Sequence, residues 1–278
     1  MIYISGSNGL IGKKLSKSIV DYIPISYRNE IPEVSFLPNS TLIHLSSSTT
    51  PRNSFDDLEN SFRSDVLIPF QIFQEYLKTN LNGKIIFLSS AGDLHSSKFN
   101  VLMNENSIPK PKSIYGTHKL LLENYIQLLH KTNKFSSVIL RTTNVYGGEI
   151  SSNRINGLID KLILSAKTKN EIDITANIKG TVNFIHIDDL IELILKAIRA
   201  NLNEYNLFLV GCSSSITIEE LIEKICLYIS PNILFKNEDS NPSYINIDTT
   251  KVQKYFNWNC KCSIDDGIIK QIQTLNVL

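Results

Sequence analysis

The sequence has little that would direct it to a nucleic acid or a membrane. In 278 residues, 28 basic side chains are balanced by 27 acidic ones, and the formal net charge is +1. A chain so close to neutral has no field of one sign that would attract nucleic acid or an anionic lipid surface. No apolar run reaches the roughly 18 residues that a bilayer span requires. We therefore expect no nucleic-acid partner and no membrane partner.

Cysteine is scarce as well. The chain has four, at Cys212, Cys226, Cys260 and Cys262, and no His or Cys near the Cys260–Cys262 pair completes a four-ligand zinc set. We therefore expect free thiols and no metal site. The first residues, 1–5, lack the basic flank and long apolar stretch of a secretory signal. They are typical of a strand, and we expect a cytoplasmic protein.

The composition is that of an ordinary globular protein, with 42% apolar and 20% charged residues. Short apolar runs alternate with helical patterns in the first half. Strands are predicted at 2–5, 23–27, 34–37, 41–45, 84–88 and 138–140, and helices at 10–20, 55–78 and 115–130. After residue 150 we expect helices at 154–168, 187–201, 217–228 and 264–276, and short strands at 172–174, 182–185, 205–209 and 233–235. Alternating strands and helices predict the α/β class, with a parallel sheet covered on both faces.

Three glycines follow the first strand at regular spacing, as Gly6-x-x-Gly9-x-x-Gly12. Gly6 lets the chain turn sharply off the strand, and Gly12 allows the following helix to pack closely. Gly9 has no side chain at the point where the backbone must approach a pyrophosphate, and the N–H groups of the helix start hold the phosphates. We predict a dinucleotide site whose residues here are Gly6, Asn8, Gly9, Leu10, Ile11 and Gly12.

Tyr115 and Lys119 stand four residues apart, on one face of a predicted helix. This spacing is expected about once by chance in such a chain, so its position carries the argument. A strand ending in Ser89-Ser90 lies just upstream. An ammonium beside a phenol lowers the pKa of that phenol, and Tyr115 would then exchange a proton with a substrate oxygen that Ser90 holds. Tyr115 and Lys119 are therefore candidates for an acid/base pair, with a serine at the end of the upstream strand beside them.

These features together resemble the extended short-chain dehydrogenase/reductase family, which contains nucleotide-sugar epimerases, dehydratases and reductases. Residues 42–47 look like the family's strand ending in His-Leu-Ala-Ala, and residues 140–147 look like its Leu-Arg-x-x-Asn-x-Tyr-Gly segment. Residues 184–190 are similar to its Phe-Ile-His-Val-Asp-Asp-Val segment. One departure is Leu94-His95, where the family has Tyr-Gly.

The resemblance implies a doubly wound parallel Rossmann sheet with a smaller C-terminal lobe. Residues 1–150 would form the dinucleotide-binding domain, to which 181–210 return, and 151–278 the substrate-binding lobe. It also implies a nucleotide-sugar substrate, a role in polysaccharide biosynthesis, and a homodimer formed through residues 55–78 and 113–132.

The resemblance implies that Ser90, Tyr115 and Lys119 are the catalytic residues, because the family places a serine at a strand end before Tyr-x-x-x-Lys. It also assigns further residues to the site. The cofactor-binding set gains Leu45, Ser46, Ser47, Ser89, Tyr115, Lys119 and Thr142, and the substrate-binding set is Ser90, Ala91 and Asn144. His44 and His186 lie on strands and are interpreted as core imidazoles. Asp188 and Asp189 suit a helix N-terminus.

The cofactor is expected to be NADP or NAD, and Arg28 favours NADP. Family members that prefer NAD place an Asp at the end of the second strand, where this chain has Ser26-Tyr27-Arg28. An arginine there is placed to pair with a 2′-phosphate. Val182 stands where UDP-sugar enzymes often carry Arg, so Arg154 and Lys161 become the candidates for the substrate phosphates.

Two chemistries remain open, with a non-catalytic alternative. Ala91-Gly92 replace the acidic pair of the dehydratases, and no Cys stands beside Ser90 as in the enzymes that epimerise C3 and C5. The resemblance then leaves hydride transfer at C4 of a hexose. The leading hypothesis is reduction of a nucleotide-linked 4-keto sugar, and the alternative is a UDP-hexose 4-epimerase that keeps NAD bound. A dinucleotide-binding regulator is disfavoured, because such relatives tend to lose Tyr or Lys.

Overall fold

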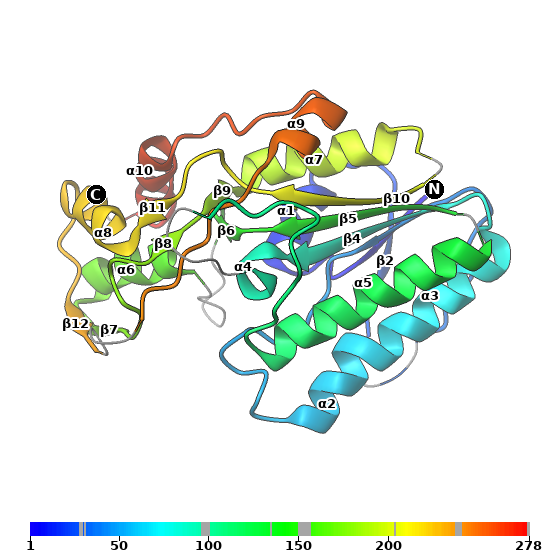
Figure 1. The fold of residues 1–278 in the computed structure, drawn as a ribbon, viewed down its shortest axis with the longest axis horizontal. Helices are drawn as coiled ribbons and strands as arrows, with labels where there is room; N and C mark the ends of the chain where they lie inside the picture. The colour runs from blue at the N-terminus through cyan, green and yellow to red at the C-terminus, as the bar shows by residue number, and fades with distance from the viewer. Residues whose placement is uncertain are drawn as a thin grey trace.

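The centre of the molecule is a six-stranded parallel sheet with helices on both faces (Figure 1). The computed structural model describes residues 1–27, 30, 32–95, 101–133, 135–149, 157–202, 204–236 and 241–276. The strands in spatial order are β10 (Tyr205–Val210), β5 (Ser136–Thr142), β4 (Lys84–Ser90), β3 (Thr41–His44), β1 (Ile2–Ser5) and β2 (Ile23–Ile25). Because the chain winds outwards from β1 in both directions, the predicted doubly wound α/β class is confirmed.

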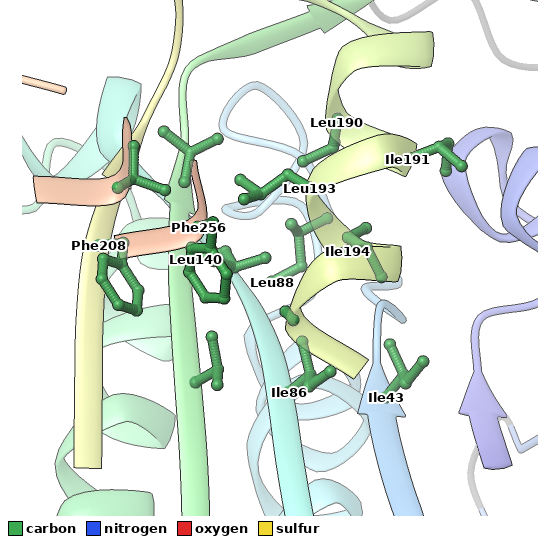
Figure 2. Close-up of a cluster of buried hydrophobic side chains, with 14 of the residues drawn as sticks. Ile43, Ile86, Leu88, Leu140, Leu190, Ile191, Leu193, Ile194, Phe208 and Phe256 are labelled. Atoms are coloured by element: carbon green, nitrogen blue, oxygen red, sulfur yellow. The ribbon is translucent and has the colours of Figure 1, made fainter. Parts of the chain in front are cut away.

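Each face of the sheet has its own helical layer. One layer contains α1 (Leu10–Ser16), α7 (Ile187–Arg199) and α9 (Thr250–Phe256), and the other contains α2 (Leu58–Phe62), the π-helical turn η1 (Arg63–Leu67), α3 (Ile68–Thr79) and α5 (Ile114–Asn133). Strand β4 is buried on both sides, since Ile86 contributes to the cluster under α7 and Phe87 to the cluster under α3 and α5. This explains why β4 is apolar without alternation. Figure 2 shows Leu193 and Ile194 of α7 in the first cluster, together with Leu88 and Ile86 of β4.

A smaller set of elements lies beyond the carboxyl ends of the strands, at the left of Figure 1. It contains α6 (Leu158–Thr168), α8 (Ile218–Cys226), α10 (Ile264–Thr274), the parallel pair β7 (Ile172–Ile174) and β12 (Ile233–Phe235), and the antiparallel pair β8 (Thr181–Val182) and β11 (Ile216–Thr217). A separate hydrophobic cluster around Leu162, Ile225 and Ile268 fills it. The pair β6 (Asn144–Tyr146) and β9 (Phe184–His186) lies between this cluster and β5. The domain boundary at residue 150 stays a prediction.

Several elements differ from the expectations. Residues 34–37 form no strand; instead Phe36 is buried, with its ring centroid 4.8 Å from that of Tyr3 and 5.3 Å from that of Tyr76. The long helix expected at 55–78 is interrupted by η1. The expected strand at 182–185 is two strands, β8 and β9, and the single-turn helix α4 (Ala91–Leu94) and helix α9 were not anticipated.

Neither a membrane span nor a metal cluster is found in the part of the chain that the structure describes. None of its described helices is both long and apolar enough to cross a bilayer. Its described His, Cys, Asp and Glu side chains form no group of three or more that could hold a metal ion.

Candidate active site

Ser90, Tyr115 and Lys119 meet at the carboxyl end of β4. Ser90 is the last residue of this strand and the N-cap of α4, where its Oγ accepts a hydrogen bond of 3.2 Å from the Asp93 backbone N–H. Helix α5 packs across β4 and carries the other two residues. The Ser90 side chain lies close enough to the Tyr115 hydroxyl to lower the pKa of that phenol. The Lys119 Nζ lies 5.5 Å from the Tyr115 ring centroid and donates to the Leu88 carbonyl at 3.1 Å.

The protonation of this trio differs from the expectation. Burial raises the pKa of Tyr115 above its ordinary value, the carboxylates of Asp93 and Asp65 raise it further, and the Ser90 side chain offsets only part of this increase. The prediction that Lys119 lowers the pKa of Tyr115 below its ordinary value is therefore wrong, because desolvation and two carboxylates dominate. Burial lowers the pKa of Lys119 to about 8, although Asp65 and Glu123 favour its charged form. At neutral pH the pair is a phenol beside an ammonium, which suits proton donation.

A pocket of about 230 Å³ opens beside Ser90. Its lining comes from four separate parts of the chain: Pro51, Ser90, Gly92, Asp93, Thr143, Asn144 and Ile245. Asn144 is exposed, and its Nδ2 donates to the Asn183 carbonyl at 3.2 Å. Ala91 is fully buried in a small cluster with Met103 and Ile245, and it is not among the residues that line the pocket. Two of the three predicted substrate-binding residues, Ser90 and Asn144, thus face one pocket.

The glycine turn has the geometry that its spacing predicts. Gly6 has a φ of +78°, and a Cβ there would lie 2.7 Å from the Ser46 backbone N. A Cβ on Gly12 would lie 2.1 Å from the Gly6 carbonyl oxygen, so only glycine allows α1 to pack against the turn. Gly9 is the N-cap of α1, and the first turn of that helix has no acidic residue. Asn8 is exposed beside it. These features fit a bound dinucleotide phosphate.

The other predicted cofactor residues lie on neighbouring strand ends. Leu45 donates its backbone N–H to the Ser5 carbonyl at 3.0 Å, and the Ser46 Oγ is 2.7 Å from the Tyr27 hydroxyl. The Ser47 Oγ donates to the Thr49 carbonyl at 3.1 Å. The structure therefore brings the 45–47 loop against the glycine turn.

Ser89 and Thr142 lie deeper, between β4 and β5. The Thr142 Oγ1 donates to the Ser89 carbonyl at 3.2 Å, and the Ser89 hydroxyl donates to the Glu123 carboxylate. Glu123 also forms a buried ion pair with Arg141, with 2.5 Å between Oε2 and Nη2. Both predicted residues are therefore engaged with the protein interior beneath the trio.

Two of the predicted residues lie outside the described residues, and the role of a third, Lys161, stays a prediction. Arg28 and Arg154 are not described. Lys161 faces Arg52, since burial lowers the pKa of Lys161 and the charge of Arg52 lowers it further. Arg52 follows Pro51, which lines the pocket. No sequence pattern singles out Arg52.

The sequence reasoning also missed two acids. One is Asp93, whose Oδ2 accepts a hydrogen bond of 2.9 Å from the Ser113 Oγ and whose carboxylate lies against Gly116 in α5. Asp65 lies in η1 and is 6% exposed. The available signal for Asp65 was a charged residue within the apolar face of the helix predicted at 55–78.

Both interpreted histidines are buried, but the His44 Nε2 has no hydrogen-bond partner among the described residues. His44 is buried, with Nδ1 2.7 Å from the Ser5 Oγ, and burial lowers its pKa. His186 is the N-cap of α7, with Asp188 and Asp189 in the first turn.

The chain is similar to enzymes that act on nucleotide sugars. A family model described as the NAD dependent epimerase/dehydratase family matches residues 34–211, which is more than half of the chain. The dTDP-4-dehydro-6-deoxyglucose reductase of Escherichia coli is 25% identical, over 99% of this chain and 97% of that enzyme. A putative UDP-glucose 4-epimerase of Methanocaldococcus jannaschii is 24% identical, over 85% of this chain and 77% of the other.

Solved structures share the fold over the whole length. MoeE5 in complex with UDP-glucuronic acid and NAD superposes with a TM-score of 0.86, covering 99% of this chain and 98% of the other, at 18% identity. At that identity the likeness shows the fold alone, and it agrees with the parallel sheet described above.

Proposed function

The chain belongs to the NAD-dependent epimerase/dehydratase family, and on that premise we propose that it reduces the C4 keto group of a nucleotide-linked hexose. The single observation that carries this proposal is the convergence of Ser90, Tyr115 and Lys119 beside a pocket. The family consists of enzymes that modify nucleotide sugars, which makes such a sugar the substrate class.

The trio has the donors that a ketone reduction needs. A bound NADPH supplies the hydride that adds to C4. Tyr115 gives its phenolic proton to the C4 oxygen, so the ketone becomes an alcohol and the phenol is reprotonated from solvent. Ser90 hydrogen-bonds the same oxygen and fixes its position. The Lys119 ammonium stabilises the negative charge that Tyr115 carries after the transfer.

The raised pKa of Tyr115 supports reduction over oxidation. A buried phenol next to two carboxylates is held in its protonated form, and the protonated form is what a reduction consumes. The near full-length similarity to the Escherichia coli reductase points the same way. Arg28 in the sequence makes NADP the proposed cofactor, with NAD as the alternative.

A 4-epimerase is the second candidate. Its supporting observations are the Ser89–Gly92 segment, which is common among epimerases of the family, and the similarity to a putative UDP-glucose 4-epimerase. Such an enzyme oxidises C4 and returns the hydride to the other face, so it keeps NAD throughout. Tyr115 would then first have to accept a proton as a phenolate, and its raised pKa disfavours that form.

The substrate phosphates and the assembly complete the proposal. The proposed partners of the substrate diphosphate are Arg52, which follows Pro51 of the pocket lining, and Lys161, whose pKa the charge of Arg52 lowers. Exposed apolar side chains on α2 and α5, among them Leu58 and Leu128, make these helices the proposed homodimer face. The free cysteines agree with a reducing compartment, and the cytoplasm is the proposed location.

A cofactor-balance experiment tests the function. The purified enzyme is mixed with NADPH and a dTDP-linked 4-keto-6-deoxyhexose, and separately with UDP-glucose and no added cofactor. We expect one NADPH consumed per sugar alcohol formed in the first mixture. Interconversion of UDP-glucose and UDP-galactose in the second mixture would instead establish the epimerase, and no reaction in either would refute both.

A further inference from the structure

Asp65 is a buried carboxylate to which the proposed reaction gives no role. It lies in η1, the π-helical turn between α2 and α3, and is 6% exposed. Turns of this kind inside α-helices occur often at functional sites. The turn packs against α5, the helix that carries Tyr115 and Lys119. A buried carboxylate needs hydrogen-bond donors or a nearby cation. Asp65 has donors in the loop after β3 and a cation, Lys119, on α5.

On one side Asp65 holds the loop that follows β3. Its Oδ1 accepts from the Ser48 backbone N–H at 2.6 Å, and its Oδ2 accepts from the Thr49 N–H at 3.2 Å. The Thr49 Oγ1 donates at 2.5 Å and the Ser47 Oγ at 3.2 Å. Four donors on one carboxylate fix the conformation of residues 46–50. The same loop leads to Pro51, in the wall of the pocket.

On the other side its charge acts on α5. The carboxylate favours the ammonium form of Lys119 and disfavours the phenolate of Tyr115, so it raises the pKa of both groups. Glu123 of α5 also favours the Lys119 ammonium, and His44 of β3 faces that ammonium.

Two further titratable groups face Asp65 itself. These are His118 on α5 and Tyr27 after β2. The negative charge of Asp65 raises the pKa of His118, which burial lowers, and it raises the pKa of Tyr27, which burial also raises. Neither group is a carboxylate, so Asp65 and Glu123 are the two acids that the structure shows acting on Lys119.

We propose that Asp65 is a positioning residue that ties the 46–50 loop to the Tyr115–Lys119 pair and supplies a counter-charge to the Lys119 ammonium. The proposal rests on the proposed function, because it gives Asp65 its role through the cofactor loop and the catalytic pair. A carboxylate with a purely structural role would hold the loop but would not change the pKa of Lys119.

The counter-charge is tested by titrating Lys119 directly. The lysines of the full chain are labelled with ¹³C and followed by NMR against pH, and the Lys119 signal is the one that disappears in Lys119→Met. We expect Asp65→Asn, which keeps an acceptor oxygen and loses the charge, to lower the pKa of Lys119 by about 1. Asp57→Asn, at the exposed N-cap of α2, is the matched control and should leave that pKa unchanged. A Lys119 pKa that is the same in Asp65→Asn and in the wild type overturns the proposal.

A second pair of variants tests the role of the loop. This pair keeps the proposal testable if Asp65→Asn does not fold. Thr49→Val removes one hydrogen bond to Asp65, whereas Thr50→Val removes a bond to Asn53 in the same loop. By calorimetry we expect Thr49→Val to weaken NADPH binding about fivefold, as for one lost hydrogen bond of about 1 kcal/mol, and Thr50→Val to leave it unchanged. Equal affinities in the two variants contradict the loop role. A wild type that binds neither NADPH nor NADH would refute the proposed function instead, and the lysine titration needs neither cofactor.

Discussion

Tyr115 illustrates how surroundings decide the behaviour of one side chain. A tyrosine beside a lysine is expected to ionise more easily, and that argument holds in water. Here the phenol is desolvated and faces Asp93 and Asp65, and the balance is reversed. Lys119 keeps its role as a cation, because two carboxylates offset part of the burial that lowers its pKa to about 8. The pair is thus poised to donate a proton near neutral pH.

Tyr115→Phe removes the proton that the reduction requires and changes little else. We expect turnover of the 4-keto sugar to fall at least about a hundredfold, the range for loss of acid catalysis, with NADPH affinity retained. Steady-state rates and calorimetric titration measure the two quantities. Tyr125→Phe is the matched control on the same helix, where the tyrosine stacks on Phe70 with 3.9 Å between ring centroids. Full turnover in Tyr115→Phe would remove this residue from the mechanism.

At the scale of elements, the sequence predicts those that local patterns determine and misses those that depend on long-range contacts. The glycine turn, β4 and α5 follow from apolar spacing and from glycine geometry, which are properties of neighbouring residues. Helix α9 does not, because it is short and its place depends on distant partners. Trp258, just after it, donates its Nε1–H to the Asp189 carbonyl at 3.1 Å and is buried in the cluster under α7.

The site shows the same division. Ser90, Tyr115 and Lys119 could be predicted because their order along the chain matches a family pattern. Asp65 could not be assigned a role, since its partners are backbone N–H groups of a loop that precedes it by 16 and 17 residues. The direction of the Tyr115 pKa was missed for a related reason, because burial is a property of the folded molecule.

Helix α6 offers a test of burial acting on an acid. Asp160 is 6% exposed, accepts a 2.9 Å hydrogen bond from the Gln271 Nε2, and has a pKa raised to about 6 by desolvation. In the unfolded chain this carboxyl ionises near pH 4. Below that pH it is protonated in both states, and above about 6 the folded state keeps a buried charge. Its contribution therefore destabilises the fold increasingly as the pH rises from about 4 to 6.

Asp160→Asn should consequently stabilise the protein at pH 7.5. An amide keeps the acceptor for Gln271 without the buried charge, and the gain is up to about 3 kcal/mol at about 1.4 kcal/mol per pH unit. Urea unfolding at pH 7.5 and at pH 4 measures it, and the gain should shrink at the lower pH. Asp173→Asn, which removes an exposed pair with Lys236, should change stability by less than about 1 kcal/mol. A less stable Asp160→Asn at pH 7.5 would show that the charge is favourable.

At the scale of the whole molecule, the pocket depends on segments that meet only in the folded chain. Ser90 ends β4 and Asn144 begins β6, whereas Ile245 comes from the far end of the sequence. Isolated bridges between Thr181 and Tyr244 and between Met103 and Ile247 hold this last segment over the carboxyl edge of the sheet. Ile245 thus gives the pocket an apolar wall that no local pattern indicates. On the other side of the sheet, the helices α2 and α5 carry exposed apolar side chains.

That outer face carries exposed leucines at helical spacing. Leu121 and Leu128 stand seven residues apart on α5, 39% and 58% exposed, so they share one face of the helix. Phe62 of α2 packs beside this face, with its ring centroid 5.8 Å from that of His118, and is 46% exposed. Apolar side chains gathered in this way favour association with another surface. A second copy of the chain, meeting the first around a two-fold axis, would cover the same residues on both protomers.

Leu128→Glu should therefore separate the protomers. A charge on each copy would be buried against the other without a partner, which costs more than the contact provides. Light scattering after size exclusion should give about twice 31.4 kDa for the wild type and about 31.4 kDa for Leu128→Glu. Leu227→Glu, at a leucine that is 77% exposed at the end of α8, should remain a dimer. A wild type that stays monomeric at micromolar concentration, or equal masses for the two variants, would place the dimer face elsewhere or remove it.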